Sequence, residues 1–186
     1  SPEARGHGVL VVMDGQIHAA QRVTKVATQG VGAFASPGYG PLGWVDDVGV
    51  HLPMASGSRQ VPFAGLDLPE QWPQVPILYG CVEPEALMLT ACLHAGVAGV
   101  VFTGTGAGQL SAGERSVLQA WPGKRPLMVR SNRCGSGPVH RCAEDERLGV
   151  LPAGSLNPQK ARVLLSLALI AGLDREGLAA LLSATP

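Results

Sequence analysis

The stretch VAGVVFTGTGAGQLSAGERSVLQAWPGKRPLMVRS, residues 97–131, decides the fold class of this chain. It begins with an apolar run rich in valine, passes through a glycine-rich turn, and ends in a second apolar run. Between the two runs, Ser111 is followed three positions later by Glu114, which is the capping-box pattern of a helix start. The stretch therefore predicts a strand, a loop, a helix and a second strand, the unit of α/β folds with parallel sheets.

The same alternation extends on both sides of this stretch. We predict a strand at 77–81, a helix at 83–96, a short strand at 149–154, and helices at 157–173 and 174–184. The helix that starts at Asn157-Pro158 is apolar on nearly every side, so it needs cover all round, which a subunit interface would provide. Residues 76–186 are thus predicted to form a small α/β domain, a parallel sheet flanked by helices.

The first residues follow a different pattern. GVLVVM, residues 8–13, predicts a buried strand, and Asp14-Gly15 predicts a hairpin turn after it. The alternation of residues 17–22 and the extended pattern of residues 23–26 predict one or two further strands. A sheet of two or three strands without a covering helix is not independently stable, so something that belongs with these strands is missing from the chain.

Residues 36–75 are interrupted by prolines and glycines and show no clear periodicity. Such a length exceeds the roughly 12–15 residues usual for a loop inside a compact domain. Several aromatic residues lie in or beside the segment, which suggests that it packs down onto its surroundings. We interpret it as an ordered interdomain linker.

Composition argues against two classes of partner. Charged residues make up 15% of the chain and the formal net charge is zero, so no basic patch supports binding to nucleic acid. The longest apolar run, residues 163–171, is far shorter than the ~20 residues of a membrane span. The chain starts at Ser1 without a secretory signal, so we expect a processed or truncated start, and the compartment, cytoplasmic or periplasmic, stays open.

No metal or cofactor is expected. Cys134, His140 and Cys142 lie close together in sequence, but their spacing is irregular and no fourth ligand is nearby. The loop pattern G-x-G-x-G at residues 104–108 differs from the dinucleotide fingerprint G-x-G-x-x-G, and no Asp or Glu ends the following strand.

Two features leave an ordinary and a functional interpretation open. Lys25 is one of three lysines, against eleven arginines. It is either an exposed strand end or an amine whose chemistry is used, since burial shifts the pKa of lysine readily. The loop 103–111 is either a tight turn with a capping box or a loop that faces a ligand with its backbone amides. The residue pattern alone favours the ordinary interpretation of both.

Four motifs, taken in order, resemble the bacterial L-asparaginase/glutaminase family: GVLVVMDGQIHAAQRVTK at 8–25, GTGAGQLS at 104–111, VRSNRCGSG at 129–137 and GSLNPQKARVLLSLAL at 154–169. The resemblance implies that residues 1–35 are the last strands of the amino-terminal domain, 36–75 the linker, and 76–186 the carboxy-terminal domain. The family motifs T-G-G-T and H-G-T-D, which supply the nucleophilic threonine and a Thr-Asp pair, do not occur in these 186 residues.

The resemblance also implies site residues. Lys25 matches the lysine of V-T-K, which helps a threonine attack the side-chain amide. Family members are homotetramers in which a neighbour's carboxy-terminal domain lends residues to each active site. Gln109 matches the lent small polar residue, more often Asn or Ser, and Glu144 is our choice for the lent acid, with Asp145 or Glu146 as alternatives.

The leading hypothesis is therefore an asparaginase-type amidohydrolase that converts asparagine, or glutamine as a second candidate, to the acid and ammonia. The chain alone is expected to be catalytically incomplete, and Asn132 departs from the family pattern R-S-S-R. One alternative is a non-catalytic carboxy-terminal module for oligomerisation or amino-acid binding. Another is an amidase subunit acting on aminoacylated tRNA, which a basic surface would favour and this composition does not.

Overall fold

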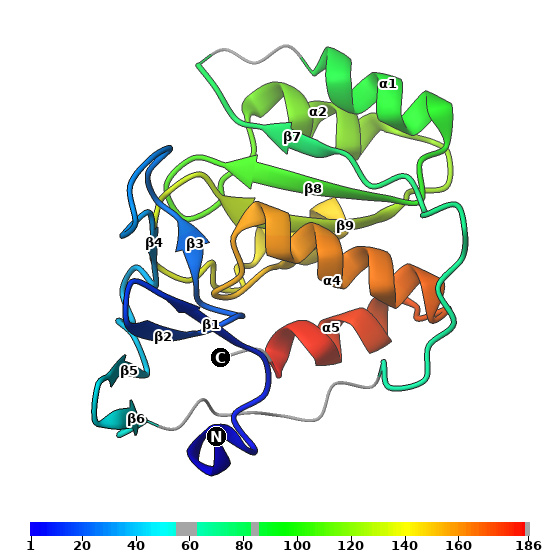
Figure 1. The fold of residues 1–186 in the computed structure, drawn as a ribbon. Helices are drawn as coiled ribbons and strands as arrows, with labels where there is room; N and C mark the ends of the chain where they lie inside the picture. The colour runs from blue at the N-terminus through cyan, green and yellow to red at the C-terminus, as the bar shows by residue number, and fades with distance from the viewer. Residues whose placement is uncertain (55–62, 83–85, 185–186) are drawn as a thin grey trace. The chain divides into compact units, whose positions relative to one another are not determined.

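The computed structural model describes residues 1–54, 63–82 and 86–184 of the chain. By its internal contacts the chain divides into two compact units, Ser1–Pro62 (unit 1) and Phe63–Pro186 (unit 2). Figure 1 labels the helices and strands of both. None of the described helices combines the length and the apolar character of a membrane span.

Unit 2 is built on a parallel sheet, which confirms the predicted fold class. Its four strands lie in the order β10-β9-β8-β7, and each neighbouring pair is parallel. Their bounds are β7 Ile77–Tyr79, β8 Gly99–Gly104, β9 Leu127–Asn132 and β10 Val150–Pro152. The two central strands are buried almost throughout, as expected of parallel strands covered on both faces.

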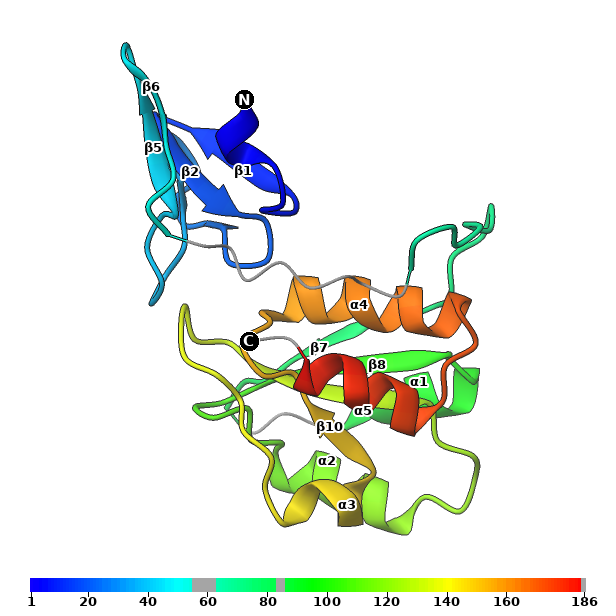
Figure 2. The ribbon, with the colours of Figure 1, turned by 90° about the horizontal axis from the view of Figure 1, so that it is seen from below.

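Helices cover both faces of this sheet (Figures 1 and 2). Alternate residues of β8 point into the two layers: Val100 and Phe102 pack with the first pair of helices, and Val101 packs with the second pair. The first pair is α1 Leu87–Ala95 and α2 Ala112–Ala120, and the second is α4 Pro158–Ile170 and α5 Arg175–Ser183. A short helix that the sequence did not predict, α3 Glu144–Leu148, packs beside α2 and leads into β10.

The two edges of the sheet differ. On β10, the N–H of Ala153 donates to the Arg130 carbonyl of β9. The backbone N–H and C=O groups of successive residues point to alternate sides of a strand. The backbone groups of Val150 and Pro152 therefore face away from β9. Nη2 of Arg175 donates to the Val150 carbonyl at 3.2 Å, and a proline has no N–H to offer. β7 pairs with β8 on one side, and the described residues place no strand on its other side.

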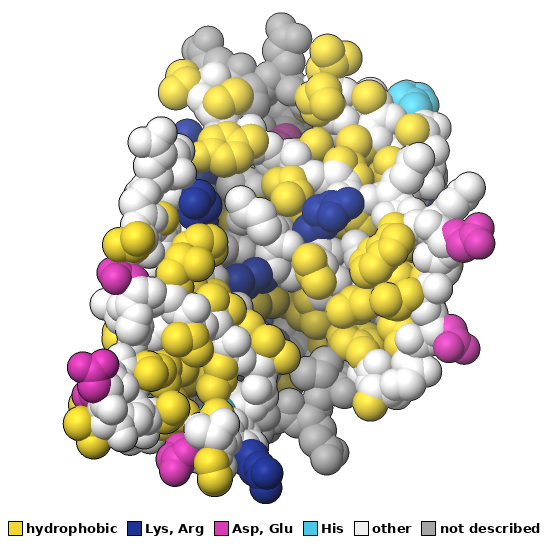
Figure 3. Space-filling model, viewed as in Figure 1, with side chains coloured by type: hydrophobic (Ala, Val, Ile, Leu, Met, Phe, Trp, Pro, Cys, Tyr) yellow, Lys and Arg dark blue, Asp and Glu magenta, His cyan; other side chains and the backbone are white. Residues whose placement is uncertain are grey.

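Helix α4 buries only part of its apolar surface within unit 2. Ala161, Leu165 and Ala168 are buried, whereas Val163 is 50% exposed. Hydrophobic side chains gather on the face of unit 2 that is seen in Figure 3. Val163 therefore stays uncovered on this helix, and contact of this part of the helix with another subunit stays a prediction.

Unit 1 consists of antiparallel strands. One sheet has the order β1-β2-β5-β6, and a second pairs β3 with β4. The bounds are β1 Leu10–Met13, β2 Gln16–Ala19, β3 Thr24–Lys25, β4 Phe34–Ala35, β5 Gly43–Asp46 and β6 Gly49–His51, after a 3-10 turn at Pro2–Ala4. Asp14 and Gly15 have φ angles of 49° and 68°, as a type I′ turn requires, so the predicted hairpin is confirmed.

Two expectations for this part of the chain need correction. The first strand is not buried, since Val12 is 56% exposed, because β1 is an edge strand and the described part of unit 1 has no α-helix to cover it. The described residues 36–54 of the predicted linker are less irregular than expected, because β5 and β6 form a hairpin within them. A Cβ on Gly43 would lie 1.8 Å from the His51 carbonyl oxygen, so the glycine there serves close strand pairing.

The core of unit 1 contains a buried histidine. His18 of β2 is 1% exposed, and its Nδ1 lies 2.9 Å from Oγ of Ser36. Its Nε2 has no hydrogen-bond partner among the described residues. Burial disfavours the imidazolium form and lowers the pKa of His18.

We expect unit 1 to lose stability as the pH falls below about 6.5, the ordinary pKa of histidine. In the unfolded chain His18 takes up a proton there, whereas in the folded chain its lowered pKa keeps it neutral. The unfolded state then binds more protons than the folded state, so the free energy of unfolding decreases as the pH is lowered. The decrease is about 1.4 kcal/mol for each pH unit between the two pKa values of His18.

Urea unfolding at about pH 7.5 and pH 5.5, either side of this window, measures the effect. His18→Gln should reduce the pH difference, and the control His51→Gln, at a partly exposed position of the same unit, should retain it. An unchanged difference in His18→Gln would assign the pH dependence to other groups.

Candidate functional site

The carboxyl edge of the sheet in unit 2 is where open α/β sheets bind ligands. Here β8 ends at Gly104 and β9 ends at Asn132. The glycine-rich loop, residues 105–110, leads from β8 towards α2. All six residues of β8 are buried, so the loop is attached to a fixed strand.

The loop folds back on itself. The N–H of Thr105 donates to the Gln109 carbonyl at 3.2 Å, and the N–H of Gln109 donates to the Thr105 carbonyl at 2.9 Å. A Cβ on Gly104 would lie 2.4 Å from the carbonyl carbon of Gly108, whose own φ is +81°, so both positions require glycine. Gln109 is exposed and the next residue, Leu110, is buried. The loop therefore presents Gln109 to solvent from a constrained backbone.

The loop ends in the predicted capping box. Oγ of Ser111 accepts a hydrogen bond from the Glu114 N–H at 3.1 Å, and the Glu114 carboxylate accepts one from the Ser111 N–H at 2.7 Å. These bonds confirm the ordinary interpretation of the end of the loop. A ligand-facing role for Gln109 stays a prediction.

A buried ion pair lies behind the loop. The side chains of Arg130 and Asp145 are 5% and 3% exposed. Nε of Arg130 donates to Oδ1 of Asp145 at 2.5 Å, and Nη2 donates to Oδ2 at 2.9 Å, the bidentate geometry of strong charge-assisted pairs. The remaining donors reach two backbone carbonyls, of Ala107 at 2.9 Å and of His140. One guanidinium thus joins the glycine-rich loop, the segment before α3, and α3 itself.

The electrostatics of the pair favour its charged form. Burial by itself raises the pKa of Asp145, but hydrogen bonds from the Arg130 guanidinium and the Cys142 N–H outweigh burial and bring the pKa below its usual value. For Arg130, burial acts to lower the pKa, and the hydrogen bond and charge of Asp145 raise it above the ordinary value. Both groups therefore carry their charges at neutral pH.

The three candidate acids lie in different surroundings. Glu144 is the first residue of α3. Its carboxylate pairs with Arg147, and its Oε2 lies 3.6 Å from Nη1 of Arg115 in α2. Its contacts are thus with helices and not with the glycine-rich loop. Glu146 pairs with two arginines. Asp145 is thus the acid that is linked to the loop, through the guanidinium of Arg130. A substrate-binding role for Glu144 stays a prediction.

Asn132 organises the turn after β9. Its amide nitrogen donates to the Gly137 carbonyl at 3.0 Å, and its amide oxygen accepts from the Cys134 N–H at 2.8 Å. Nη1 of the next residue, Arg133, donates to the Gly80 carbonyl at 3.1 Å and so links the ends of β9 and β7. The departure from the family pattern at Asn132 is therefore accommodated by a structural role.

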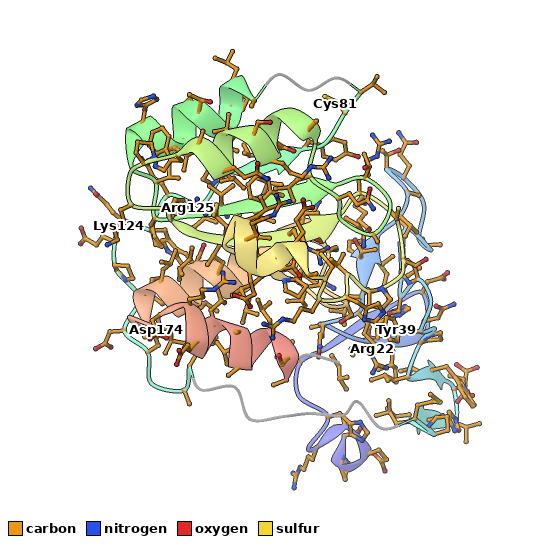
Figure 4. The ribbon with its side chains drawn as sticks, turned by 180° about the vertical axis from the view of Figure 1, so that it is seen from behind. Arg22, Tyr39, Cys81, Lys124, Arg125 and Asp174 are labelled. Atoms are coloured by element: carbon orange, nitrogen blue, oxygen red, sulfur yellow. The ribbon has the colours of Figure 1, made fainter. Side chains whose placement is uncertain are left out.

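Lys25 lies in unit 1 and is exposed. Its Nζ is 5.1 Å from the centre of the Phe34 ring, which belongs to the paired strand β4. Arg22 makes a similar contact with the Tyr39 ring at 4.5 Å (Figure 4). The structure thus shows Lys25 as an exposed strand end, and its catalytic role stays a prediction.

Sequence reasoning missed the Arg130–Asp145 pair, although one signal was present. Arg130 interrupts an apolar strand, and a charge inside a buried strand needs a partner.

Among the described residues, no group of three or more His, Cys, Asp or Glu side chains is gathered as a metal site.

Two family models match the chain, one after the other. The model described as "Asparaginase, N-terminal" matches residues 1–56, and that of the "Glutaminase/Asparaginase C-terminal domain" matches residues 74–182. The chain belongs to the asparaginase family. The amino-terminal match reaches past β5 and β6, the two strands that lie in the segment interpreted as a linker.

Relatives within the asparaginase family show the same coverage. The chain is 37% identical to "Probable L-asparaginase periplasmic" of Haemophilus influenzae, in an alignment that covers 90% of this chain. It is 36% identical to "L-asparaginase 2" of Bacillus subtilis, in an alignment that covers 91% of this chain. It is 33% identical to "Glutaminase-asparaginase" of Pseudomonas fluorescens biotype A over 91%. These alignments cover 49%, 45% and 48% of the relatives, so the chain spans about half of their length.

A solved asparaginase structure matches nearly the whole chain. The crystal structure of the "Probable Cytoplasmic L-asparaginase" from Campylobacter jejuni is similar over 99% of this chain and 57% of its own, with 33% identity and a TM-score of 0.89. The fold inferred from the alternating pattern is therefore the asparaginase fold.

Proposed function

We propose that this chain supplies part of an asparaginase-type amidohydrolase, which converts asparagine to aspartate and ammonia, with glutamine as a second candidate substrate. The observation that carries the proposal is the match to both family models, in order along the chain. The names of the relatives include both L-asparaginase and glutaminase-asparaginase, which supports the same two amides as candidates.

The proposed reaction passes through an acyl-enzyme. A threonine hydroxyl attacks the side-chain carbonyl carbon, ammonia leaves, and water then releases the acid. Lys25 would orient and polarise this threonine as an ammonium beside a carboxylate and a hydroxyl. The motifs that supply those two groups are absent from the 186-residue sequence, so Lys25 requires them from another stretch of polypeptide.

Unit 2 would contribute to substrate binding. Gln109 is exposed on a constrained loop, which suits a residue lent to the active site of a neighbouring subunit. Glu144 is the proposed lent acid, with a side chain that is 34% exposed. No cofactor, metal, nucleic acid or membrane takes part in the proposed function.

A non-catalytic carboxy-terminal module for oligomerisation or amino-acid binding is the second candidate. It is favoured by the exposure of Lys25 and by the absence of the nucleophile motifs from the sequence. The reading frame that encodes the chain discriminates between the two. In-frame T-G-G-T and H-G-T-D motifs upstream of Ser1 support the enzyme, and their absence from the frame supports the module.

Lys25→Met should remove most of the turnover of an active enzyme that contains this chain. The substitution deletes the ammonium and keeps a stem of similar length, so the strand pair β3–β4 should persist. Steady-state ammonia release measures the loss, and circular dichroism checks the fold. Lys124→Met, at another exposed lysine, is the matched control. Equal turnover in both variants would return Lys25 to the role of an ordinary strand end.

We expect the chain to self-associate through unit 2, as a homo-oligomer. Its exposed apolar side chains include Tyr79, Val82, Leu87, Met88 and Val163, each at least half exposed, and such surfaces mark contact sites. Light scattering over a dilution series measures the assembly, and Val163→Asp should weaken it. A strictly monomeric chain at micromolar concentration would contradict the expectation.

A further inference from the structure

The hydrogen bonds of Arg130 and Asp145 hold three segments that are distant in sequence. Nη1 of Arg130 donates to the Ala107 carbonyl, at the exposed tip of the glycine-rich loop, at 2.9 Å. Nη2 donates to the His140 carbonyl. Oδ2 of Asp145 accepts the Cys142 N–H at 2.8 Å, so the carboxylate holds the same segment that the guanidinium holds.

The loop has few other side chains to fix it. Three of its neighbouring positions are glycine, at 104, 106 and 108, and the φ angles of Gly106 and Gly108 are +49° and +81°. A chain of this composition has many accessible conformations. The tip around Ala107 is exposed, and the guanidinium of Arg130 reaches it from the rigid strand β9. That bond, together with the Thr105–Gln109 pairing, constrains the backbone that presents Gln109.

A purely stabilising role would not require this pair. Apolar residues of similar volume often replace a buried ion pair without loss of stability. An apolar side chain at position 130 could not donate to the carbonyls of Ala107 and His140, however. The rigid, planar fork of arginine binds several acceptors at once, and the ammonium of lysine does not reproduce that geometry.

We propose that Arg130 and Asp145 are positioning residues that fix the glycine-rich loop, and with it Gln109, for contact with the amino-acid substrate. The contact between Gln109 and the substrate rests on the proposed function. The fixing of the loop is independent of it.

Amide hydrogen exchange in the 186-residue chain tests the fixing of the loop. In Arg130→Lys, the amides of Gly108 and Gln109 should exchange about 10-fold faster relative to those of β8, because only the local opening becomes easier. Arg125→Lys is the matched control. Arg125 also donates to two backbone carbonyls, of Leu118 and Leu148, but it precedes β9 and lies at the end of the sheet away from Cys81 (Figure 4).

Either of two results in the variant would overturn the fixing of the loop. One is unchanged exchange at Gly108 and Gln109 in Arg130→Lys, and the other is a rise that is equal in β8 and in the loop, which is the mark of general destabilisation. Asp145→Asn keeps the shape of the side chain and is compared in the same way if Arg130→Lys does not fold. In the unaltered chain, exchange at the rate of an unstructured loop would overturn the proposal by itself.

Kinetics in an active enzyme that contains this chain test the contact with substrate. Arg130→Lys should raise KM for asparagine about 10-fold while kcat changes less, the pattern of lost binding geometry, and Arg125→Lys should change neither. A loosened loop with unchanged KM would overturn the substrate role of Gln109 and leave the fixing of the loop supported. An unaltered enzyme that hydrolyses neither amide would overturn the proposed function, and the exchange experiment would still decide the role of the pair.

Discussion

Purified by itself, the 186-residue chain should release no ammonia from asparagine or glutamine. Loss of a nucleophile from a catalytic group that acts as a unit costs on the order of 10⁶ in kcat. The motifs T-G-G-T and H-G-T-D, which resemblance assigns to this attack, are absent from the sequence. Lys25, the proposed activating residue, is exposed and lies over a phenylalanine ring. An ammonium without its hydroxyl and carboxylate partners cannot form the acyl-enzyme.

An enzyme-coupled ammonia assay measures this expectation, with an active relative as the positive control and Lys25→Met as the negative one. Addition of a separately expressed polypeptide that carries the two missing motifs should restore turnover if the halves assemble. Ammonia release by the unsupplemented chain, in proportion to its concentration and absent from Lys25→Met, would place the nucleophile inside these residues.

Asp145→Ala should lower the free energy of unfolding by about 3–5 kcal/mol, because it leaves the buried guanidinium of Arg130 without its counter-charge. The side chains of the pair are 5% and 3% exposed, so water does not replace the lost carboxylate easily. Glu144→Ala, one residue earlier on the same helix, is the matched control. Its ion pairs are partly exposed, and pairs of that kind contribute roughly 0–1 kcal/mol.

Urea unfolding of both variants at pH 7 gives the two differences from their midpoints, provided that the slope of the transition is unchanged. Equal small losses in Asp145→Ala and Glu144→Ala would show that the pair near β9 is solvated in solution. A large loss in Glu144→Ala would show instead that the surface pairs of α3 carry the stability of this region.

The fold of unit 2 could be predicted because its signals are local. Each central strand contains a short apolar run, residues 100–102 in β8 and residues 127–129 in β9. The helices begin at Ser111 and at Asn157-Pro158, where the side-chain caps form as the pattern indicates. The hairpin β5–β6 escaped prediction because its turn depends on Asp46, whose carboxylate accepts from the Val48 and Gly49 N–H groups at 2.9 and 3.1 Å. Prolines and glycines around it concealed the short strands.

The candidate site could be predicted only where one segment defines it. The glycine-rich loop was found from its own composition, and Gln109 within it was singled out by the resemblance to the family. The partner of Arg130 could not be found, because Asp145 is fifteen residues away and stands between two other acids. The sequence does not show which of Glu144, Asp145 and Glu146 is buried. In the structure Asp145 is the buried acid of the five-residue helix α3, and the other two acids are not buried.

The unlike edges of the sheet in unit 2 limit how copies of the chain could polymerise. At β10 the Val150 carbonyl is occupied by Arg175 and Pro152 lacks an N–H, so an incoming strand finds no continuous ladder there. Any strand added from another copy must use β7, and a β7-to-β7 pairing consumes the open edge of both molecules. Growth then stops at two copies, so an endless cross-β filament cannot propagate through this sheet.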